Sequence, residues 1–148
     1  MKLFFRQQRS NFNAKKLVDL QNQCFEAPQS QYSENDMVSF IKNPTITILA
    51  TSESLVIFQL AADQAEIISI GVIPQKRRQR LGSSLIDKLT SHCLLRQIKA
   101  IYLEVDETNI AALSFYNKCN FIKTGVRKNY YKNSSNLRSH AVLMKKSL

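Results

Sequence analysis

The chain is short of the residues that cross-link a protein, bind metals or bend the backbone sharply. Its 148 residues include three cysteines, two histidines, three glycines, three prolines and no tryptophan. The cysteines are odd in number, widely spaced and set in apolar segments, which argues against disulfides and against a zinc site. We therefore expect reduced thiols, no metal and a cytoplasmic location.

Acidic residues are also scarce. The chain has 11 Asp and Glu against 21 Lys and Arg, which gives a formal net charge of +10 at pH 7. Such an excess favours an anionic partner, such as a polyphosphate ligand, RNA, a ribosome or a membrane surface. Solubility alone is the competing explanation of the same charge.

Long apolar runs, repeats and linkers are absent as well. No apolar run approaches the roughly 20 residues that span a bilayer, and the opening MKLFFRQQRS turns polar too early for a signal peptide. No repeat, low-complexity stretch or Gly/Ser linker divides the chain. Residues 1–148 are therefore predicted to form a single domain, with no membrane as a partner.

The spacing of apolar residues predicts an α/β fold around a mixed central sheet. Ser33 and Asp36 are typical of a helix start, and Pro44 ends the same helix. The run at 64–73 is apolar on both faces, as expected of a central strand. Helices are predicted at 13–25, 33–43, 83–95 and 109–119. Strands are predicted at 2–6, 45–53, 54–63, 64–73, 100–105, 121–131 and 140–147, which gives the order β-α-α-β-β-β-α-β-α-β-β.

Four cations crowd the junction between the predicted central strand and the next helix, in VIPQKRRQRLGSSLI (72–86). Gly71 and Gly82, two of the three glycines, bracket this basic junction. A helix N-terminus offers unpaired amides and a partial positive charge, and a glycine lets the backbone approach a ligand closely. A phosphate cradle therefore explains the glycines as well as the charge. A nucleic-acid patch or a solvated turn explains the charge alone, and both readings stay open on these residues.

Several segments together resemble the GCN5-related N-acetyltransferase (GNAT) superfamily. They are AEIISIGVIPQKRRQRLGSSLIDKL, IYLEVDETNIAALSFYNKCNFIKTGVRKNYY and AVLMKK, and the resemblance covers nearly the whole chain. The pyrophosphate loop of the family has the form Arg/Gln-x-x-Gly-x-Gly/Ala, which residues 77–82 match except at Arg80. Within the superfamily the chain is most similar to the bacterial RimI type, the ribosomal-protein N-alpha-acetyltransferases.

The resemblance implies acetyl-CoA as the cosubstrate. Main-chain groups of the central strand would hold the thioester and pantetheine, and the basic junction would hold the pyrophosphate. Asn109 would cap its helix, contact coenzyme A, or do both, and tight sheet packing is the alternative reason for Gly71. The implied cofactor-binding residues are Ile70, Gly71, Val72, Arg77, Arg78, Gln79, Arg80, Leu81, Gly82, Ser83 and Asn109.

Two residues are implied in the chemistry by the same resemblance. Glu104 would accept the proton of the attacking amine, and Tyr116 would act as the general acid beside the thioester sulfur. The structural alternatives are an ion pair between Glu104 and an arginine, and a packing role for Tyr116 in the core. An α-amine titrates near 8 and a lysine side chain near 10.4, so a modest base suits the α-amine better.

Three positions depart from the family pattern. Arg80 stands where glycine is usual, and we expect a helical backbone there that accepts any residue, with the guanidinium directed outward. The alternative is an unfavourable φ or crowding of the cofactor. The usual Pro-Trp-Ser becomes Pro28 followed by Tyr32 and Ser33, and His140 replaces an acid. The residues implied in binding the acceptor are Tyr32, Tyr130 and Tyr131.

The sequence thus predicts one N-acetyltransferase domain that acetylates the N-terminus of a protein. By resemblance, that protein belongs to the small ribosomal subunit, and the net charge suggests an electrostatic association with the ribosome. One alternative is a GNAT enzyme that acetylates lysine side chains or small-molecule amines. The other is a catalytically idle GNAT fold that binds RNA or the ribosome.

Overall fold

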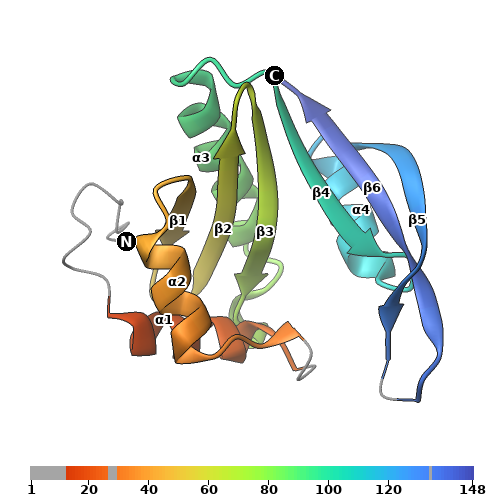
Figure 1. Cartoon of the computed structure of the whole chain (residues 1–148), viewed down its shortest axis with the longest axis horizontal. Helices are drawn as coiled ribbons and strands as arrows, with labels where there is room; N and C mark the ends of the chain where they lie inside the picture. The colour runs from red at the N-terminus through yellow and green to blue at the C-terminus, as the bar shows by residue number, and fades with distance from the viewer. Residues whose placement is uncertain (1–12, 27–29, 134) are drawn as a thin grey trace.

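The computed structural model describes residues 13–26, 30–133 and 135–148 (Figure 1). The helices within these ranges are α1 (Ala14–Cys24), α2 (Glu34–Lys42), α3 (Leu81–Leu94) and α4 (Ile110–Lys118). The strands are β1 (Ile46–Ala50), β2 (Ser54–Ala61), β3 (Gln64–Val72), β4 (Ala100–Asp106), β5 (Ile122–Lys132) and β6 (Arg138–Ser147). The predicted α/β class is confirmed, as is the order of elements from the first helix onward. The strand predicted at 2–6 lies outside the described residues.

The local signals in the sequence act as predicted. The Ser33 side chain accepts the Asp36 N–H, and the Asp36 carboxylate accepts the Ser33 N–H at 2.8 Å, so α2 begins with a capping box. Its last residue is Lys42, just before Pro44. β1 and β2 form an antiparallel hairpin around Ser52, as the polar residues between the two apolar runs predict.

The strands form one mixed sheet in the order β1-β2-β3-β4-β6-β5. Only β3 and β4 are parallel neighbours, and the connection between them runs through α3. In Figure 1, α1 and α2 lie in front of β1–β3, whereas α3 lies behind β2 and β3 and α4 behind β4 and β6. The front face of β4–β6 has no helix over it in the described part of the chain.

Two apolar cores hold these layers together. The α1–α2 core joins side chains such as Leu20 and Met37 to Ile48 and Leu55 on the sheet. The larger core, behind the sheet, is formed by one buried stripe of α3, by Tyr116 of α4, and by side chains of β1, β2, β3, β4 and β6. The α3 members are Leu85, Ile86, Leu89 and Cys93.

The sheet opens in its middle. β3 and β4 are paired only at Gln64–Ala100, Ala65–Ile101 and Glu66–Tyr102, and then diverge toward the lower edge in Figure 1. On its other side β3 stays paired with β2 but carries a bulge, because Ser69 faces Ile57 while Ile67 faces Phe58. Ile68 is therefore the extra residue of the bulge. Bulges bend a strand and increase its twist, which is how β3 turns away from β4.

The expectation that β3 is apolar on both faces holds for only part of the strand. Ala65 and Ile67 are buried against the larger core, whereas Glu66 between them is exposed. The reason is that α1 and α2 do not cover this end of the strand. One face of the first half of β3 is consequently available to a ligand.

Gly71 is required by close packing between β3 and α1. A Cβ at this position would lie 2.6 Å from Cys24 Cβ and 3.0 Å from the Phe25 ring. The backbone of Gly71 has a negative φ, so the constraint is space and not conformation. Both features expected of a glycine in an apolar strand, a nearby bulge and a close approach, are present.

Replacing Gly71 by alanine should lower the free energy of unfolding by about 2 kcal/mol, because α1 would have to move away from the sheet. Urea denaturation measures this change. Gly125→Ala is the matched control, since a Cβ there would meet only Leu143 Cδ1, at 3.2 Å, which can rotate away. Equal stability of the Gly71 and Gly125 variants would contradict the assignment.

Candidate active site

The basic junction forms a sharp corner between β3 and α3. A short 3-10 turn, η2 (Pro74–Lys76), follows the strand, and Arg78 and Arg80 then adopt left-handed backbone conformations with φ of 61° and 62°. Within the described residues, no side chain caps the first turn of α3. The amides of that turn are therefore available to an anionic ligand. The predicted phosphate contacts at 77–83 all lie on this corner.

The backbone at Arg80 is not helical, and the expectation made from the sequence is wrong here. Its φ of 62° and ψ of 9° lie in the left-handed region, at the N-cap of α3. A residue with a Cβ pays roughly 1–2 kcal/mol in this region. Glycine avoids that cost, which is the physical reason it suits this position. The Arg80 side chain itself is exposed, as expected.

Replacing Arg80 by glycine should raise the free energy of unfolding by about 1 kcal/mol. Relief of the left-handed strain should exceed the extra entropy that the unfolded chain gains with a glycine. Chemical denaturation measures the gain. Gln79→Gly, between the two left-handed residues, has no such strain to relieve and should be neutral or destabilising. A loss of stability in the Arg80 variant would mean that contacts of the arginine outweigh its strain.

Arg77 holds the backbone around the corner in place. One of its terminal nitrogens donates to the carbonyl oxygen of Cys24 at 3.0 Å, and its Nε donates to the carbonyl oxygen of Val72 at 3.3 Å. The side chain thus ties the junction to the end of α1 and to the end of β3. Lys76 is also engaged, in an ion pair with Glu53 at 3.1 Å. These two cations therefore shape the corner.

The remaining cations of the corner, Arg78 and Arg80, are exposed and form no ion pair in the part of the chain that the structure describes. The Gln79 side chain donates to the carbonyl of Gln75 at 3.4 Å, within the turn. Two open guanidinium groups beside uncapped helix amides are the donor set that a phosphate group prefers. The residues present therefore fit a phosphate-bearing ligand.

Gly82 is explained by packing as well as by access. A Cβ on it would lie 3.1 Å from the ring of Phe115, on α4. The missing side chain lets α4 pack against the first turn of α3. Leu81 and Ser83 flank Gly82, and the Ser83 hydroxyl donates to the Arg80 carbonyl at 3.0 Å.

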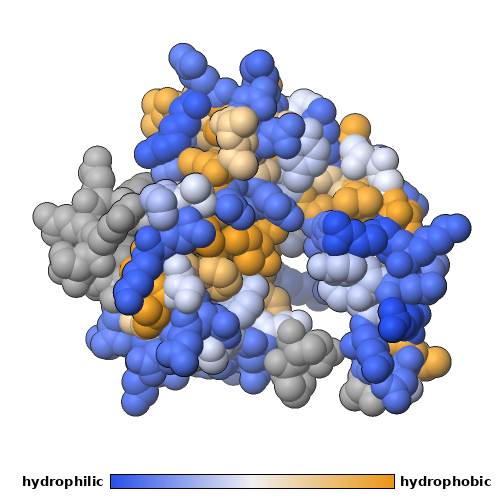
Figure 2. All heavy atoms as spheres, in the orientation of Figure 1, coloured by the Kyte–Doolittle hydropathy of each residue, from blue (hydrophilic) through white to orange (hydrophobic). Residues whose placement is uncertain are grey.

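Ile70, Gly71 and Val72 lie in the part of β3 that has separated from β4. Their partners on the other side are residues of β2, so their β4-facing edge has no partner strand in the described chain. Asn109 caps α4, since its side-chain oxygen accepts the Ala112 N–H at 3.1 Å. The corner, the open strand edge and the start of α4 thus surround the opening in the sheet, which Figure 2 shows as a hollow.

Glu104 lies on β4 across this opening, and it forms an ion pair. Its carboxylate is 3.1 Å from a guanidinium nitrogen of Arg127, on β5, and its side chain is only 19% exposed. The Arg127 guanidinium also stacks on Tyr130, 4.5 Å from the ring centroid. The ion pair with an arginine, which was the structural alternative for Glu104, is therefore present in the protein. The ion pair is compatible with the predicted chemical role, because a carboxylate that is paired on one side still has lone pairs for an amine.

Two tyrosines predicted at the site, Tyr131 and Tyr116, have raised pKa values. Burial raises the pKa of Tyr131 to about 12, and the charges of Glu104 and Tyr130 add to this effect. Burial raises the pKa of Tyr116 above its ordinary value, with Tyr131 and Cys119 as further causes. Both phenols are consequently protonated near neutral pH, so each has a proton available for a hydrogen bond.

Tyr116 combines a packed ring with an open hydroxyl. The ring is 8% exposed and contacts Phe115 and Phe121, with ring centroids 5.2 Å and 5.7 Å away. Its hydroxyl forms no hydrogen bond with the described residues, and it is not among the fully buried polar atoms that lack a partner. The packing role is therefore real, and the hydroxyl remains free to donate to a ligand.

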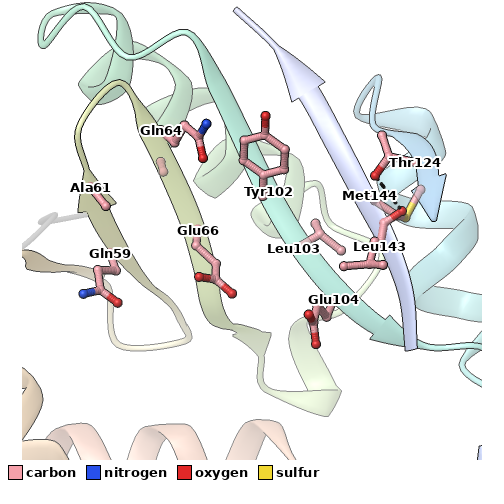
Figure 3. A pocket seen from close by; sticks show the side chains of 11 residues that line it. Gln59, Ala61, Gln64, Glu66, Tyr102, Leu103, Glu104, Thr124, Leu143 and Met144 are labelled. Carbon is pink, nitrogen blue, oxygen red and sulfur yellow. Dashed lines mark hydrogen bonds between the residues drawn. The ribbon is translucent and has the colours of Figure 1, made fainter. Parts of the chain in front are cut away.

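A pocket of about 360 Å³ opens on the helix-free face beside Glu104 (Figure 3). Glu66 of β3 and Glu104 of β4 both line it, together with Tyr102, two residues before Glu104 on β4. No lysine or arginine is among the described residues that line it, in a protein that is otherwise strongly basic. Glu66 forms no ion pair with the described residues. The pocket is thus suited to a cationic or hydrogen-bond-donating group.

The three tyrosines predicted on the acceptor side are not brought together. Tyr130 and Tyr131 are neighbours near Glu104, with ring centroids 5.1 Å apart. Tyr32 instead packs against Phe40 of α2, at 5.2 Å, in the α1–α2 core. Pro28 lies outside the described residues.

Sequence reasoning missed Arg127 and Glu66 as site residues. Arg127 belongs to the RKNYY segment, but its reach to Glu104 depends on a strand register that the segment does not reveal. Glu66 could have been found from its place in an apolar run, where it is the only charged residue. His140, found in place of an acid, accepts the Asn129 N–H at 2.9 Å and so fixes the irregular part of β5.

Two further properties of the described residues bear on function. No group of three or more His, Cys, Asp or Glu side chains is placed to hold a metal ion in these ranges. None of the described helices has the length and apolar character needed to cross a membrane.

Comparison with known proteins agrees with this geometry. The sequence pattern of the acetyltransferase (GNAT) family matches residues 14–121. The chain is similar to the [ribosomal protein bS18]-alanine N-acetyltransferase of Escherichia coli K12, with 33% identity over 88 residues. This match covers 60% of the chain and 59% of the relative, so the chain spans about three fifths of the curated relative's length.

Two solved structures are similar over more of the fold. The crystal structure of the ribosomal-protein-S18-alanine N-acetyltransferase from Escherichia coli has a TM-score of 0.82 at 22% identity, covering 99% of this chain and 94% of that one. A putative streptothricin acetyltransferase from Bacillus anthracis, solved in complex with acetyl coenzyme A, has a TM-score of 0.66 at 23% identity, covering 75% and 67%. At these identities the structures establish the fold alone. With most of its length matched by the family pattern and with the fold in agreement, the chain belongs to the acetyltransferase (GNAT) family.

Proposed function

We propose that residues 1–148 form one N-acetyltransferase domain that transfers acetyl from acetyl-CoA to the N-terminal amine of a protein. The names of its relatives support a small-subunit ribosomal protein as the acceptor, and hence action in the cytoplasm. The observation that carries the proposal is the opening between β3 and β4, with the basic, uncapped corner at one side and Glu104 at the other.

The residues of the corner fit the phosphate-bearing donor. The amides at 81–83 and the guanidinium groups of Arg78 and Arg80 would hold its phosphates, while Arg77 keeps the corner in shape. The open edge of 70–72 would hold the extended part of the donor through backbone hydrogen bonds. When bound, acetyl-CoA supplies an acetyl group activated as a thioester.

Glu104 would receive the proton of the acceptor amine, directly or through a water. An α-amine near pKa 8 is partly neutral at physiological pH, whereas a lysine near 10.4 costs roughly 3 kcal/mol more to deprotonate at the same pH. A carboxylate at the rim of an open pocket is therefore sufficient for an α-amine. Tyr116, which is protonated and has an open hydroxyl, would donate to the leaving thiolate.

The choice of nitrogen is tested with two peptides of the same sequence. One has a free N-terminus and no lysine, and the other has a blocked N-terminus and one lysine. Mass spectrometry after incubation with acetyl-CoA should find the first acetylated and the second largely unmodified. Faster modification of the lysine peptide would favour the alternative enzyme, which acetylates lysine side chains or small-molecule amines. No turnover of either peptide, or of small amines, would favour an idle fold.

We also propose that the net charge of +10 draws the protein to the ribosome. Electrostatic attraction between exposed charges weakens as salt shortens the screening length, from about 10 Å at 0.1 M to about 3 Å at 1 M. Co-sedimentation with ribosomes should therefore decrease steeply between 50 and 500 mM KCl. Association that does not respond to salt would contradict this part of the proposal.

A further inference from the structure

The positive charge of the chain is concentrated in its last 41 residues. Residues 1–107 contain 13 Lys and Arg and 11 Asp and Glu, so they are close to neutral. Residues 108–148 contain eight Lys and Arg and not one Asp or Glu. This last segment forms α4 and the β5–β6 hairpin. A marked charge asymmetry between two parts of one chain is typical of proteins that bind nucleic acid or membranes.

The cations of this segment are exposed and mostly unpaired. Arg127 has an acidic partner, Glu104, and Lys146 donates to the Cys119 carbonyl at 2.9 Å. Five others are exposed and form no ion pair with any described residue. We call these five the basic hairpin cluster: Lys118, Lys123, Lys128, Lys132 and Arg138.

Protection of a sheet edge explains only part of this arrangement. Lysines on an edge strand prevent unwanted pairing with other chains, and β5 is an edge strand. That purpose does not require the complete absence of acids over 41 residues, because acidic residues protect an edge as well. It also does not account for Lys118, which lies at the end of α4.

An exposed aromatic ring, of the kind that stacks on bases, lies in the chain among the cations of the cluster. Tyr130 is 49% exposed and lies in the chain between Lys128 and Lys132. Its neighbour Tyr131 contacts it edge to face. Basic side chains that follow a phosphate backbone, interleaved with an aromatic platform, are the usual elements of single-stranded nucleic-acid binding.

The hairpin also projects from the molecule beside the pocket that Glu66 and Glu104 line. In Figure 1 its closed end extends at the lower right, away from the helices, and Figure 2 shows mainly hydrophilic side chains over it. Arg127 reaches from the hairpin to Glu104. A polyanion lying on the hairpin would therefore be adjacent to the pocket.

We propose that the basic hairpin cluster and Tyr130 bind single-stranded RNA. This RNA binding does not depend on acetyl transfer. If the proposed activity is also correct, RNA and the acceptor peptide would occupy neighbouring sites, and the acceptor N-terminus would reach the enzyme while its protein is bound to RNA.

The test measures RNA binding without donor or acceptor. A fluorescein-labelled 20-nucleotide RNA of mixed sequence is titrated with the full chain, and anisotropy is followed at 50–200 mM KCl. Lys118, Lys123, Lys128 and Lys132 are replaced together by glutamine. Affinity should fall at least tenfold, and the dependence of log Kd on log salt should become shallower by about 3, since each of the four lost contacts to a single strand removes about 0.7 unit of slope.

The matched control removes the same charge elsewhere. Lys15, Lys16 and Lys42 on α1 and α2, and Lys88 on α3, are replaced by glutamine, which gives the same net charge in both variants. This control should change affinity less than threefold. Equal losses in the two variants would overturn the proposal, because net charge alone would then explain binding. Absence of wild-type binding at 100 mM KCl would overturn it too, as would preferential binding to vesicles of anionic phospholipid.

Discussion

Glu104→Gln should reduce kcat/KM for a peptide with a free N-terminus by about 100-fold at pH 7, within the range that general bases contribute. Glutamine keeps the shape of the side chain and a hydrogen-bond acceptor, but it cannot take up the amine proton. The deficit should narrow above pH 9, where an α-amine with a pKa near 8 has already lost its proton. Initial rates from pH 6.5 to 9.5 measure both effects.

Two variants separate the chemical role of Glu104 from its ion pair. Arg127→Gln breaks the same pair, with its 3.1 Å contact, but leaves the carboxylate in place, so kcat should fall much less than in the Glu104 variant. Glu66→Gln removes the other carboxylate of the pocket and should alter KM for the acceptor more than kcat. Equal losses in the Glu104 and Arg127 variants, with the fold intact, would show that the pair matters and the base does not.

Tyr116→Phe should lower kcat by between about 10- and 100-fold, at the modest end for a general acid. The phenol is a weaker acid than a thiol near 8.5, because burial raises its pKa further, so donation to the leaving thiolate is completed late. KM for acetyl-CoA and the free energy of unfolding should change little, since the ring and its contacts with Phe115 and Phe121 remain. Steady-state kinetics and urea denaturation measure the two quantities.

Tyr131→Phe is the control for this assignment. Tyr131 is also buried in part and protonated, with a pKa of about 12, and it influences Tyr116 electrostatically. A larger loss of kcat in the Tyr131 variant than in the Tyr116 variant would transfer the acid role to Tyr131. Because both pKa values are raised, neither phenol ionises below pH 10, and kcat of the wild type should show no alkaline decline from them.

The order of elements could be predicted because local signals agree with the final structure. Helical spacing, the capping box at Ser33 and Asp36, and the β-branched runs each depend on residues a few positions apart. The corner at 77–83 could be placed for the same reason, as a basic segment between a strand and a helix. What distinguishes the corner in detail is not local. Arg77 donates to the carbonyl of Cys24, which is 53 residues away in the sequence.

The conformation of Arg80 is a second feature that could not be predicted from the sequence. An arginine argues against a left-handed backbone, and only the packing of the whole corner imposes φ of 62° there. The ion pair of Glu104 is a third such feature, because it depends on the register between β5 and β6. This register shifts at two places, and at the second of them Arg127 faces Ala141 while Tyr131 faces Ser139. Three residues of β5 therefore lie opposite one residue of β6, and the face on which each β5 side chain lies could not be counted from the sequence.

The short pairing between β3 and β4 has a consequence for motion. Among the described residues, the direct backbone links between the two halves of the sheet are three residue pairs and the hydrogen bond from the Lys99 N–H to the Asp63 carbonyl, at 2.7 Å. The halves are therefore joined chiefly by side chains that pack beneath them. Amide protons on the inner edge of β3 beyond Glu66 should therefore exchange with deuterium faster than those in the β1–β2 ladder. A ligand that bridges the opening would act as a missing strand and slow this exchange, so the rate of labelling at 69–72 reports directly on occupancy.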